Sequence, residues 1–218
     1  MARKSDIPGR IVEAALNLAV RQGWRHTSIS AIAAEAGLDL AQVHAAFPSK
    51  ASIVRGFVKR VDEQVLADTA TPMAIKKTGE KAGREAGGSA RDRLFDVLMR
   101  RFDALTPHKA GLAAIIGNAC ADPLAAVVLL PRVMCSMAWM LEAAGLSSSG
   151  PCGAFRVKGL ALVYAEAFRA WLGDDSEDMA KTMAALDRAL RRAERVVNLC
   201  LPRAREGAQG TAQETASG

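Results

Sequence analysis

The chain has 218 residues, of which 50% are hydrophobic and 24% charged, so most of it is expected to fold into one medium domain or a small domain joined to a larger one. Its net charge of +6 is compatible with nucleic acid or an acidic membrane surface and selects neither. Alanine is abundant and tyrosine occurs once, which favours helices over sheets.

Helical periodicity begins after a short basic stretch at residues 1–5, which is expected to be a loose arm. Asp6 can cap a first helix, with Pro8 tolerated in its first turn, and Gly23 is expected to end it after about Gln22. The apolar stripe of this helix should brace the following helices from behind.

A pair of short helices is predicted over residues 27–50. Thr27 or Ser28 can cap the first helix, because a hydroxyl satisfies a backbone N–H that has no partner inside the helix. Gly37 is expected to end it, because glycine adopts the left-handed conformation that other residues resist. Apolar residues recur at three- and four-residue spacing along this first helix, so one of its faces is expected to be buried.

The second short helix is expected to begin at Asp39, with Gln42 three residues on completing a capping box. Val43 and Phe47 lie four positions apart and are predicted to point inward. This leaves an outward face made of Ala41, Gln42, His44 and Ala45. Two short helices joined by a glycine turn form the unit that places a recognition helix in the DNA major groove, although the same corner occurs in helical proteins that never touch DNA.

A fourth helix is predicted after Pro48, capped by Ser49 and carrying an apolar residue at every fourth position from Ile53 to Val65. Residues 67–90 are polar, basic and glycine-rich without a sustained apolar period, so we expect a flexible linker there.

The remaining chain is predicted to be helical to residue 201. Asp92 is expected to open one helix, Pro107 a second that ends near Cys120, and Pro123 a long apolar third that ends near Ala144. The apolar run approaches the length of a membrane span, but the Pro131-Arg132 pair favours a buried helix instead.

Two final helices are predicted after a break at residues 145–153. Their apolar residues repeat at alternating three- and four-residue spacing, which is typical of helices packed nearly antiparallel. Residues 202–218 lack core-forming side chains and are expected to be a disordered tail.

No enzyme chemistry is indicated. The three histidines are isolated, and no catalytic or phosphate-binding fingerprint occurs, so we expect no catalytic residue and no cofactor. The four scattered cysteines form no C-x-x-C pair, which argues against a metal site and a disulfide framework and suits a reducing cytoplasm. No signal peptide is expected at the start of the chain. The acids around Asp174 are interpreted as helix caps.

Residues 10–60 resemble the TetR family of bacterial transcriptional regulators. The resemblance is carried by RIVEAALNLAVRQGW in the first helix, by TSISAIAAEAGL, and by the run VHAAFPSK. It implies a three-helix DNA-binding head followed by a helical body that binds a ligand and forms a homodimer.

The resemblance also implies roles for individual residues of the head. Lys50 matches a lysine that contacts phosphate, Thr27 matches a threonine near phosphate, and His44 occupies the position of a phosphate-contacting tyrosine. Gln42 faces the groove and can bond adenine, and Ala41 permits close approach to the DNA. The recognition helix departs from the family pattern, since it contains no Lys or Arg to supply phosphate contacts.

For the body, the resemblance implies a pocket for a small apolar or amphipathic molecule and dimerisation through the last two helices. Methionine and aromatic side chains line adaptable pockets but also fill ordinary cores. The pocket candidates are Phe95, Met99, Phe102, Met134, Met137 and Trp139. The dimer candidates are Tyr164, Phe168, Met183, Leu186, Leu190 and Val197.

A second resemblance covers roughly the C-terminal 125 residues. The segment WLGDDSEDMAKTMAALDRAL, with RLFDVLMRRFDAL upstream, is similar to the lipid-binding proteins of ubiquinone biosynthesis. That family has a TetR-like fold without a working DNA-reading head, which leaves a lipid-binding accessory protein as the alternative function.

The sequence thus predicts an all-α protein with a helix-turn-helix head at residues 1–66, a linker at 67–90, a ligand-binding and dimerisation domain at 91–201 and a tail at 202–218. The leading hypothesis is a cytoplasmic, homodimeric repressor that binds an operator in double-stranded DNA and is released by a ligand, without an integral membrane segment. Its two recognition helices would lie about one DNA turn apart, roughly 34–36 Å.

Overall fold

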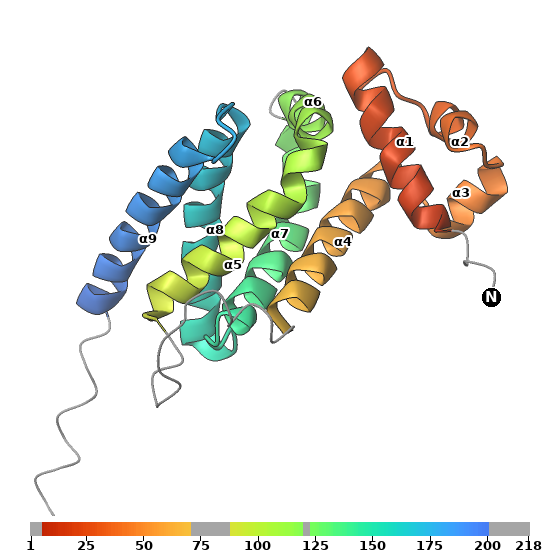
Figure 1. The fold of residues 1–218 in the computed structure, drawn as a ribbon. Helices are drawn as coiled ribbons and strands as arrows, with labels where there is room; N and C mark the ends of the chain where they lie inside the picture. Colours follow the sequence, from red (N-terminus) through yellow and green to blue (C-terminus); the bar gives the residue numbers. More distant parts are fainter. Residues whose placement is uncertain (1–5, 71–87, 120–122, 201–218) are drawn as a thin grey trace, which may run out of the picture.

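The computed structural model describes residues 6–70, 88–119 and 123–200. Within these ranges the chain forms α-helices, one short 3₁₀ helix and connecting turns, with no β-strand among them (Figure 1). The predicted all-α fold is therefore confirmed. The expected N-terminal arm, the C-terminal tail and residues 71–87 of the expected linker lie outside the described residues.

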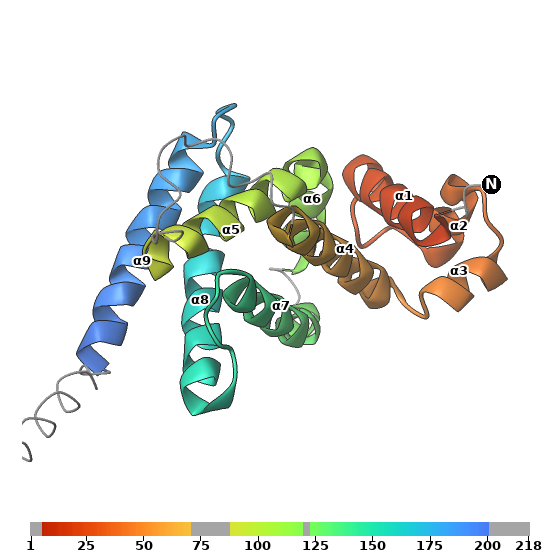
Figure 2. The same cartoon turned by 60° about the horizontal axis from the view of Figure 1, so that its bottom comes forward.

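The head consists of α1 (Ile7–Gln22), α2 (Ile29–Ala36) and α3 (Leu40–Ala46), which lie together at one end of the molecule (Figures 1 and 2). Local capping explains its boundaries. The Asp6 carboxylate accepts a hydrogen bond from the Gly9 N–H at the start of α1. Of the two candidate caps of α2, Ser28 makes the bond, and Gly37 ends α2 in the left-handed conformation at φ 62°.

Helix α4 (Lys50–Ala70) runs from the head into the body, where it packs against α5 (Ala90–Leu105) and α7 (Pro123–Ala143). Its predicted apolar stripe is buried. The helix continues to Ala70, so residues 67–70 of the expected linker are helical. Helix α5 begins at Ala90, two residues before the predicted start, because Ser89 is the cap and Asp92 completes a capping box behind it.

The remaining body elements are η2 (Thr106–His108), α6 (Lys109–Ala119), α8 (Gly150–Leu172) and α9 (Ala180–Cys200). Pro107 lies inside η2 and does not start α6, which begins two residues later. The expected break at residues 145–153 is shorter than predicted, because α8 already begins at Gly150 with a proline in its first turn.

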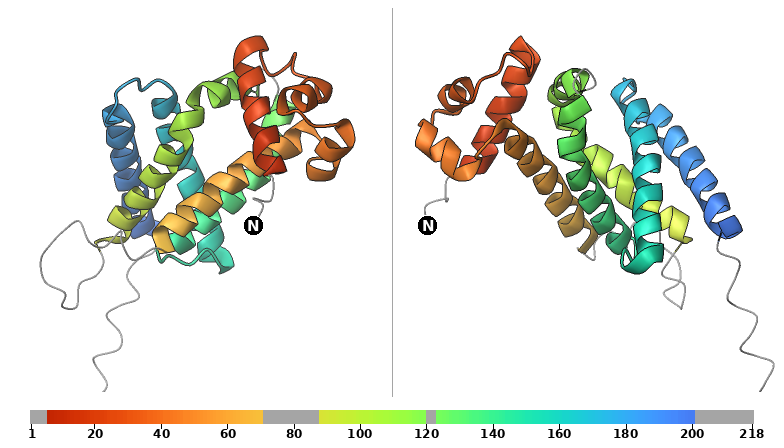
Figure 3. Two further views of the ribbon diagram at one scale, coloured as in Figure 1. Left: turned by 45° about the vertical axis from the view of Figure 1, so that its right-hand side comes forward. Right: turned by 180° about the vertical axis from the view of Figure 1, so that it is seen from behind.

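Helices α8 and α9 lie side by side at the end opposite the head (Figure 3). Their shared seam joins a cluster of aromatic rings from α5 and α8. The Phe102 ring stacks on Tyr164 with the centroids 5.5 Å apart, and Trp171 lies 5.9 Å from Phe102. Both Phe102 and Trp171 are almost fully buried, so this cluster forms the centre of the body.

The head contacts the body through α1 and α6 as well as through α4. Gly111 on α6 lies so close to Leu16 on α1 that a β-carbon at residue 111 would be 2.9 Å from the Leu16 Cδ2. Glycine thus permits this approach of the two helices. In the described part of the chain, no helix has the length and apolar character needed to cross a membrane.

Candidate nucleic-acid interface

Helix α3 presents a polar outer face on a buried anchor. Val43 is fully buried against α1 and α2, whereas Ala41, Gln42, His44 and Ala45 are exposed. The seven-residue helix has little stability of its own, so the packing of Val43 and the turn before it hold it in place. These four side chains form an outward surface that a duplex can reach.

The amide of Gln42 is already engaged at the start of α3. Its Oε1 accepts a hydrogen bond from the Asp39 N–H at 3.1 Å, and the Asp39 carboxylate accepts one from the Gln42 N–H at 2.7 Å. This is the predicted capping box. It leaves the Gln42 Nε2 group as the donor that can turn to a base edge, so the bidentate reading of adenine would weaken the cap.

Thr27 lies below the surface of the head. It is 2% exposed, and its hydroxyl donates to the Gly23 carbonyl at 3.0 Å, which closes the turn between α1 and α2. Ser28 and Ser30 are exposed instead, with their hydroxyl oxygens 2.9 Å apart. The sequence pattern predicted Ser28 only as a helix cap and did not single out Ser30, so neither was predicted as an exposed polar group of a DNA-facing surface.

Lys50 is the first residue of α4, and its ammonium group is partly withdrawn from water. It donates to the Trp24 carbonyl at 2.6 Å and lies 4.5 Å from the centroid of the Trp24 ring. Burial lowers the pKa of Lys50. The side chain therefore links the turn before α2 to the start of α4, which restrains it relative to a freely mobile surface lysine.

The turn between α2 and α3 is held from behind by Arg10 of α1. Its guanidinium donates to the Ala36 carbonyl and, at 3.2 Å, to the Gly37 carbonyl. A cation at the end of α2 also complements the helix dipole. A second arginine of α1, Arg21, forms an exposed ion pair with Glu35 at 2.5 Å. Helix α1 thereby fixes the angle between α2 and α3.

The charge of α3 is unusual for a DNA-reading element. The helix contains no Lys or Arg, and its cap is the acidic Asp39. The basic side chains of the head stand on flanking elements, among them the exposed Arg25 and Arg55 and the half-buried Lys50. Phosphate contacts, where they form, would therefore come from these elements and from backbone N–H groups.

A model of the tetR family of bacterial regulatory proteins matches residues 11–56, from α1 into α4. Over these residues the chain is similar to the TetR family. The match covers most of the three-helix head and the first part of α4. None of the curated proteins compared with the chain matched it in sequence.

Solved TetR structures share the fold over most of the chain. A TetR transcriptional regulator from Nitrosomonas europaea is 21% identical, with a TM-score of 0.66 and coverage of 86% of this chain and 98% of its own. A second from Rhodococcus sp. RHA1 is 22% identical at a TM-score of 0.56, covering 92% and 100%. A third from Streptomyces coelicolor is 18% identical at 0.54, covering 92% and 85%. The body thus has the TetR regulator fold as well.

The six pocket candidates of the body differ in burial. Phe102 and Met137 are fully buried in the core, and Trp139 is 51% exposed. Phe95, Met99 and Met134 are partly buried against the core. A cleft of about 650 Å³ lies elsewhere, between the head and the body, and none of the six lines it. Its walls include Phe47 and Phe57 as well as His108.

The side chains of the dimer candidates are buried or partly buried within the protomer. Tyr164, Leu186 and Leu190 are buried, and Phe168, Met183 and Val197 are partly buried. The apolar side chains that α8 and α9 expose are different ones. Leu162 is 75% exposed, and Phe155 and Val196 are about half exposed. The alternating three- and four-residue spacing therefore identified residues that pack between α8 and α9. The exposed apolar residues of these helices lie outside that contact.

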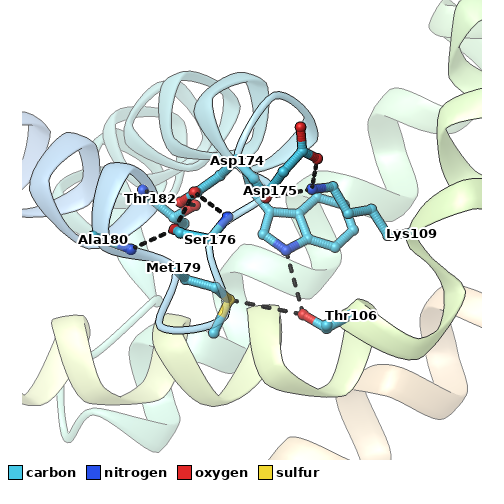
Figure 4. A network of polar contacts seen from close by, with 9 residues as sticks. Thr106, Lys109, Asp174, Asp175, Ser176, Met179, Ala180 and Thr182 are labelled. Atoms are coloured by element: carbon cyan, nitrogen blue, oxygen red, sulfur yellow. Dashed lines mark hydrogen bonds and ion pairs between the residues drawn. The ribbon is translucent and has the colours of Figure 1, made fainter.

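The crowded acids before α9 form a structural network (Figure 4). The Asp174 carboxylate accepts bonds from Ser176 and, at 2.8 Å each, from the N–H and hydroxyl of Thr182. Lys109 donates to the Asp174 carbonyl at 2.6 Å and pairs with Asp175. The network joins α6 to the start of α9. Among the described residues, no group of His, Cys, Asp or Glu side chains is arranged to hold a metal ion.

Proposed function

We propose that this protein is a transcriptional regulator that binds double-stranded DNA through α2 and α3. The observation that carries the proposal is the exposed face of α3, held on a TetR-type head by the capping box, by the buried Val43 and by Arg10. The chain is then a binding protein and not an enzyme, and its place of action is the cytoplasm.

The finer proposal is a repressor that a small apolar or amphipathic ligand releases from its operator. Helix α4 supports such coupling, because it starts beside the recognition helix and packs against α5 and α7 in the body. Movement of α4 would change the orientation of the head. Ligand binding in the body can shift the protein between DNA-binding and released states only if the ligand prefers one of them.

The proposed regulator works as a homodimer. The exposed Leu162, Phe155 and Val196 on α8 and α9 support this, since large exposed apolar side chains on neighbouring helices favour association. A two-fold axis through this end of the molecule would leave both heads available to one operator with two half-sites.

The test is fluorescence anisotropy with labelled DNA from the protein's own upstream region across a salt series. The variants are His44→Ala, at the exposed face of α3, and Lys59→Ala, an exposed lysine of α4 that pairs with Glu63. Tight binding that weakens with salt and with His44→Ala, but not with Lys59→Ala, supports the proposal. Weak binding that is indifferent to DNA sequence and to His44→Ala would refute it.

The second candidate is a lipid-binding accessory protein of the ubiquinone-biosynthesis type. The absence of Lys and Arg from α3 favours it, because phosphate contacts supply much of the affinity for DNA. Native mass spectrometry of the purified protein distinguishes the two. A co-purifying isoprenoid lipid together with no operator binding favours the accessory protein.

A further inference from the structure

A buried ionic cluster joins α4 to the body. The Asp62 carboxylate of α4 accepts hydrogen bonds from Arg101 of α5, from Arg132 of α7 and, at 2.5 Å, from the Ser136 hydroxyl of α7. Asp62 and Arg101 are each 3% exposed, and Ser136 is fully buried. One carboxylate thus connects three helices.

The cluster has more positive than negative charge. Two guanidinium groups face one carboxylate, and in the described part of the chain Asp62 is the acid that pairs with either arginine. The Arg101 guanidinium also lies 5.3 Å from the centroid of the Tyr164 ring, whose face attracts cations. A buried charge without a counter-charge is strongly destabilising.

Each of the two arginines also has an N–H donor without a hydrogen-bond partner among the described residues. These donors are the Nε–H groups of Arg101 and Arg132, and both are buried. Buried polar groups are rarely left without a partner. Two unused N–H donors beside an excess positive charge are the chemistry that a second oxyanion would satisfy, because a guanidinium binds carboxylates with Nε and an Nη together.

The cluster is closed on one side and reachable on the other. The Arg101 side chain is 4% exposed, whereas that of Arg132 is 19% exposed. Apolar residues flank both arginines, with Leu98 one turn before Arg101 on α5 and with Leu129 and Val133 beside Arg132 on α7. A ligand that approaches past Arg132 would meet cationic donors set in an apolar surround.

We propose that Arg101 and Arg132 form the binding site for the carboxylate of a small organic acid with an apolar chain. The acid approaches at the Arg132 side and draws that side chain away from Asp62, so that its carboxylate accepts from the unused Arg132 Nε–H. Because it competes with Asp62 for the same guanidinium groups, it loosens the attachment of α4 to α5 and α7. The regulatory consequence, weaker DNA binding, rests on the proposed function, whereas the binding site itself does not.

The test compares octanoate with octanamide, which has the same chain length and no charge. Isothermal titration calorimetry without DNA measures both affinities for the wild type, for Arg132→Gln and for Arg188→Gln, an exposed arginine of α9 outside the cluster. Octanoate is expected to bind the wild type and Arg188→Gln about tenfold or more tightly than octanamide, a preference that Arg132→Gln removes.

A second variant tests whether the site of the Asp62 carboxylate can bind a free carboxylate. Asp62→Ala leaves a carboxylate-sized space between two arginines and a serine, so acetate is expected to raise its melting temperature more than that of the wild type. Equal affinities for octanoate and octanamide in the wild type would overturn the proposal, as would an Arg132→Gln variant that keeps the preference. If octanoate binds at Arg132 and leaves operator affinity unchanged, the binding site stands and the ligand-responsive regulator is contradicted.

Discussion

Lys50 at the start of α4 is joined to Trp24, 26 positions earlier in the chain, by a hydrogen bond of 2.6 Å to its carbonyl and by a contact with its ring. The residue that the TetR resemblance assigns to phosphate therefore also fastens the turn before α2 to α4. The predicted phosphate contact and the contact with Trp24 can be separated by measuring DNA binding and folding stability on the same variants.

Lys50→Ala is expected to lower the free energy of unfolding by about 1–2 kcal/mol, because it removes a hydrogen bond from a charged donor and a cation–π contact. Urea denaturation followed by circular dichroism measures this change. Lys59→Ala on the same helix removes only an exposed lysine at 3.5 Å from Glu63, so it should change stability by no more than about 0.5 kcal/mol. Equal effects of the two substitutions would show that the Trp24 contact contributes nothing.

Arg10→Ala is expected to destabilise the head by about 1–2 kcal/mol, because the carbonyls of Ala36 and Gly37 lose their charged donor. The angle between α2 and α3 should become less fixed, so amide hydrogen exchange in α3 should accelerate. Arg21→Ala is the control, since Arg21 pairs with Glu35 in the open and its loss should matter little. Unchanged exchange in α3 for both variants would argue against the restraint by Arg10.

The parts of the fold that followed from sequence are those determined by neighbouring residues. Asp6, Gly37 and the pair Asp39 and Gln42 cap or end their helices as predicted, because each cap involves groups three or four positions apart. The start of α5 was predicted two residues too late, and the reason again lies in a local cap. Ser89 and Asp92 form one capping box, and the sequence pattern identified its acid and not its hydroxyl.

Contacts between distant residues could not be predicted in the same way. Nothing in the sequence pairs Asp62 with Arg101 and Arg132, which are 39 and 70 positions away. The pocket candidates show a related difficulty, because Phe102 and Met137 suit a cavity wall and a core equally well by residue type. Apolar spacing likewise identified the seam of α8 and α9 but not Leu162, whose exposure depends on where both helices lie.

Gly111→Ala is expected to cost about 1–3 kcal/mol, because the new β-carbon would lie 2.9 Å from the Leu16 Cδ2 and 3.3 Å from its Cα. The strain falls between α1 and α6, so it should also change how the head is held on the body. Gly117→Ala on the same helix meets open space and should instead stabilise the protein by about 0.5–1 kcal/mol. Thermal denaturation of the two variants tests this difference in sign.

Asp174→Asn addresses the acid sensitivity of the start of α9. Hydrogen bonds from Ser176 and then Thr182 hold the pKa of Asp174 well below its ordinary value, against burial, which raises it. A lowered pKa in the folded state means that the ionised carboxylate stabilises the fold above about pH 4, and that this stabilisation is lost as the pH falls below it. The variant should therefore melt at a lower temperature than the wild type at pH 7, with a smaller difference near pH 3.

The control for that experiment is Asp175→Asn, whose side chain is 98% exposed beside Lys109. It should follow the wild type closely between pH 7 and pH 3. A wild type and an Asp174→Asn variant whose melting temperatures stay equally far apart at both pH values would contradict the role of the ionised carboxylate.

Leu162→Glu is expected to dissociate the proposed homodimer, because it places a charge where a 75% exposed leucine would otherwise be buried between two copies of α8. Val20→Glu is the matched control, since Val20 is 53% exposed on α1 in the head, away from α8 and α9. Sedimentation velocity should give a dimer for the wild type and Val20→Glu and a monomer for Leu162→Glu. The monomer should keep its helical circular dichroism spectrum but lose most of its operator affinity, because one head alone contacts one half-site. A Leu162→Glu protein that still sediments as a dimer would place the interface on another surface.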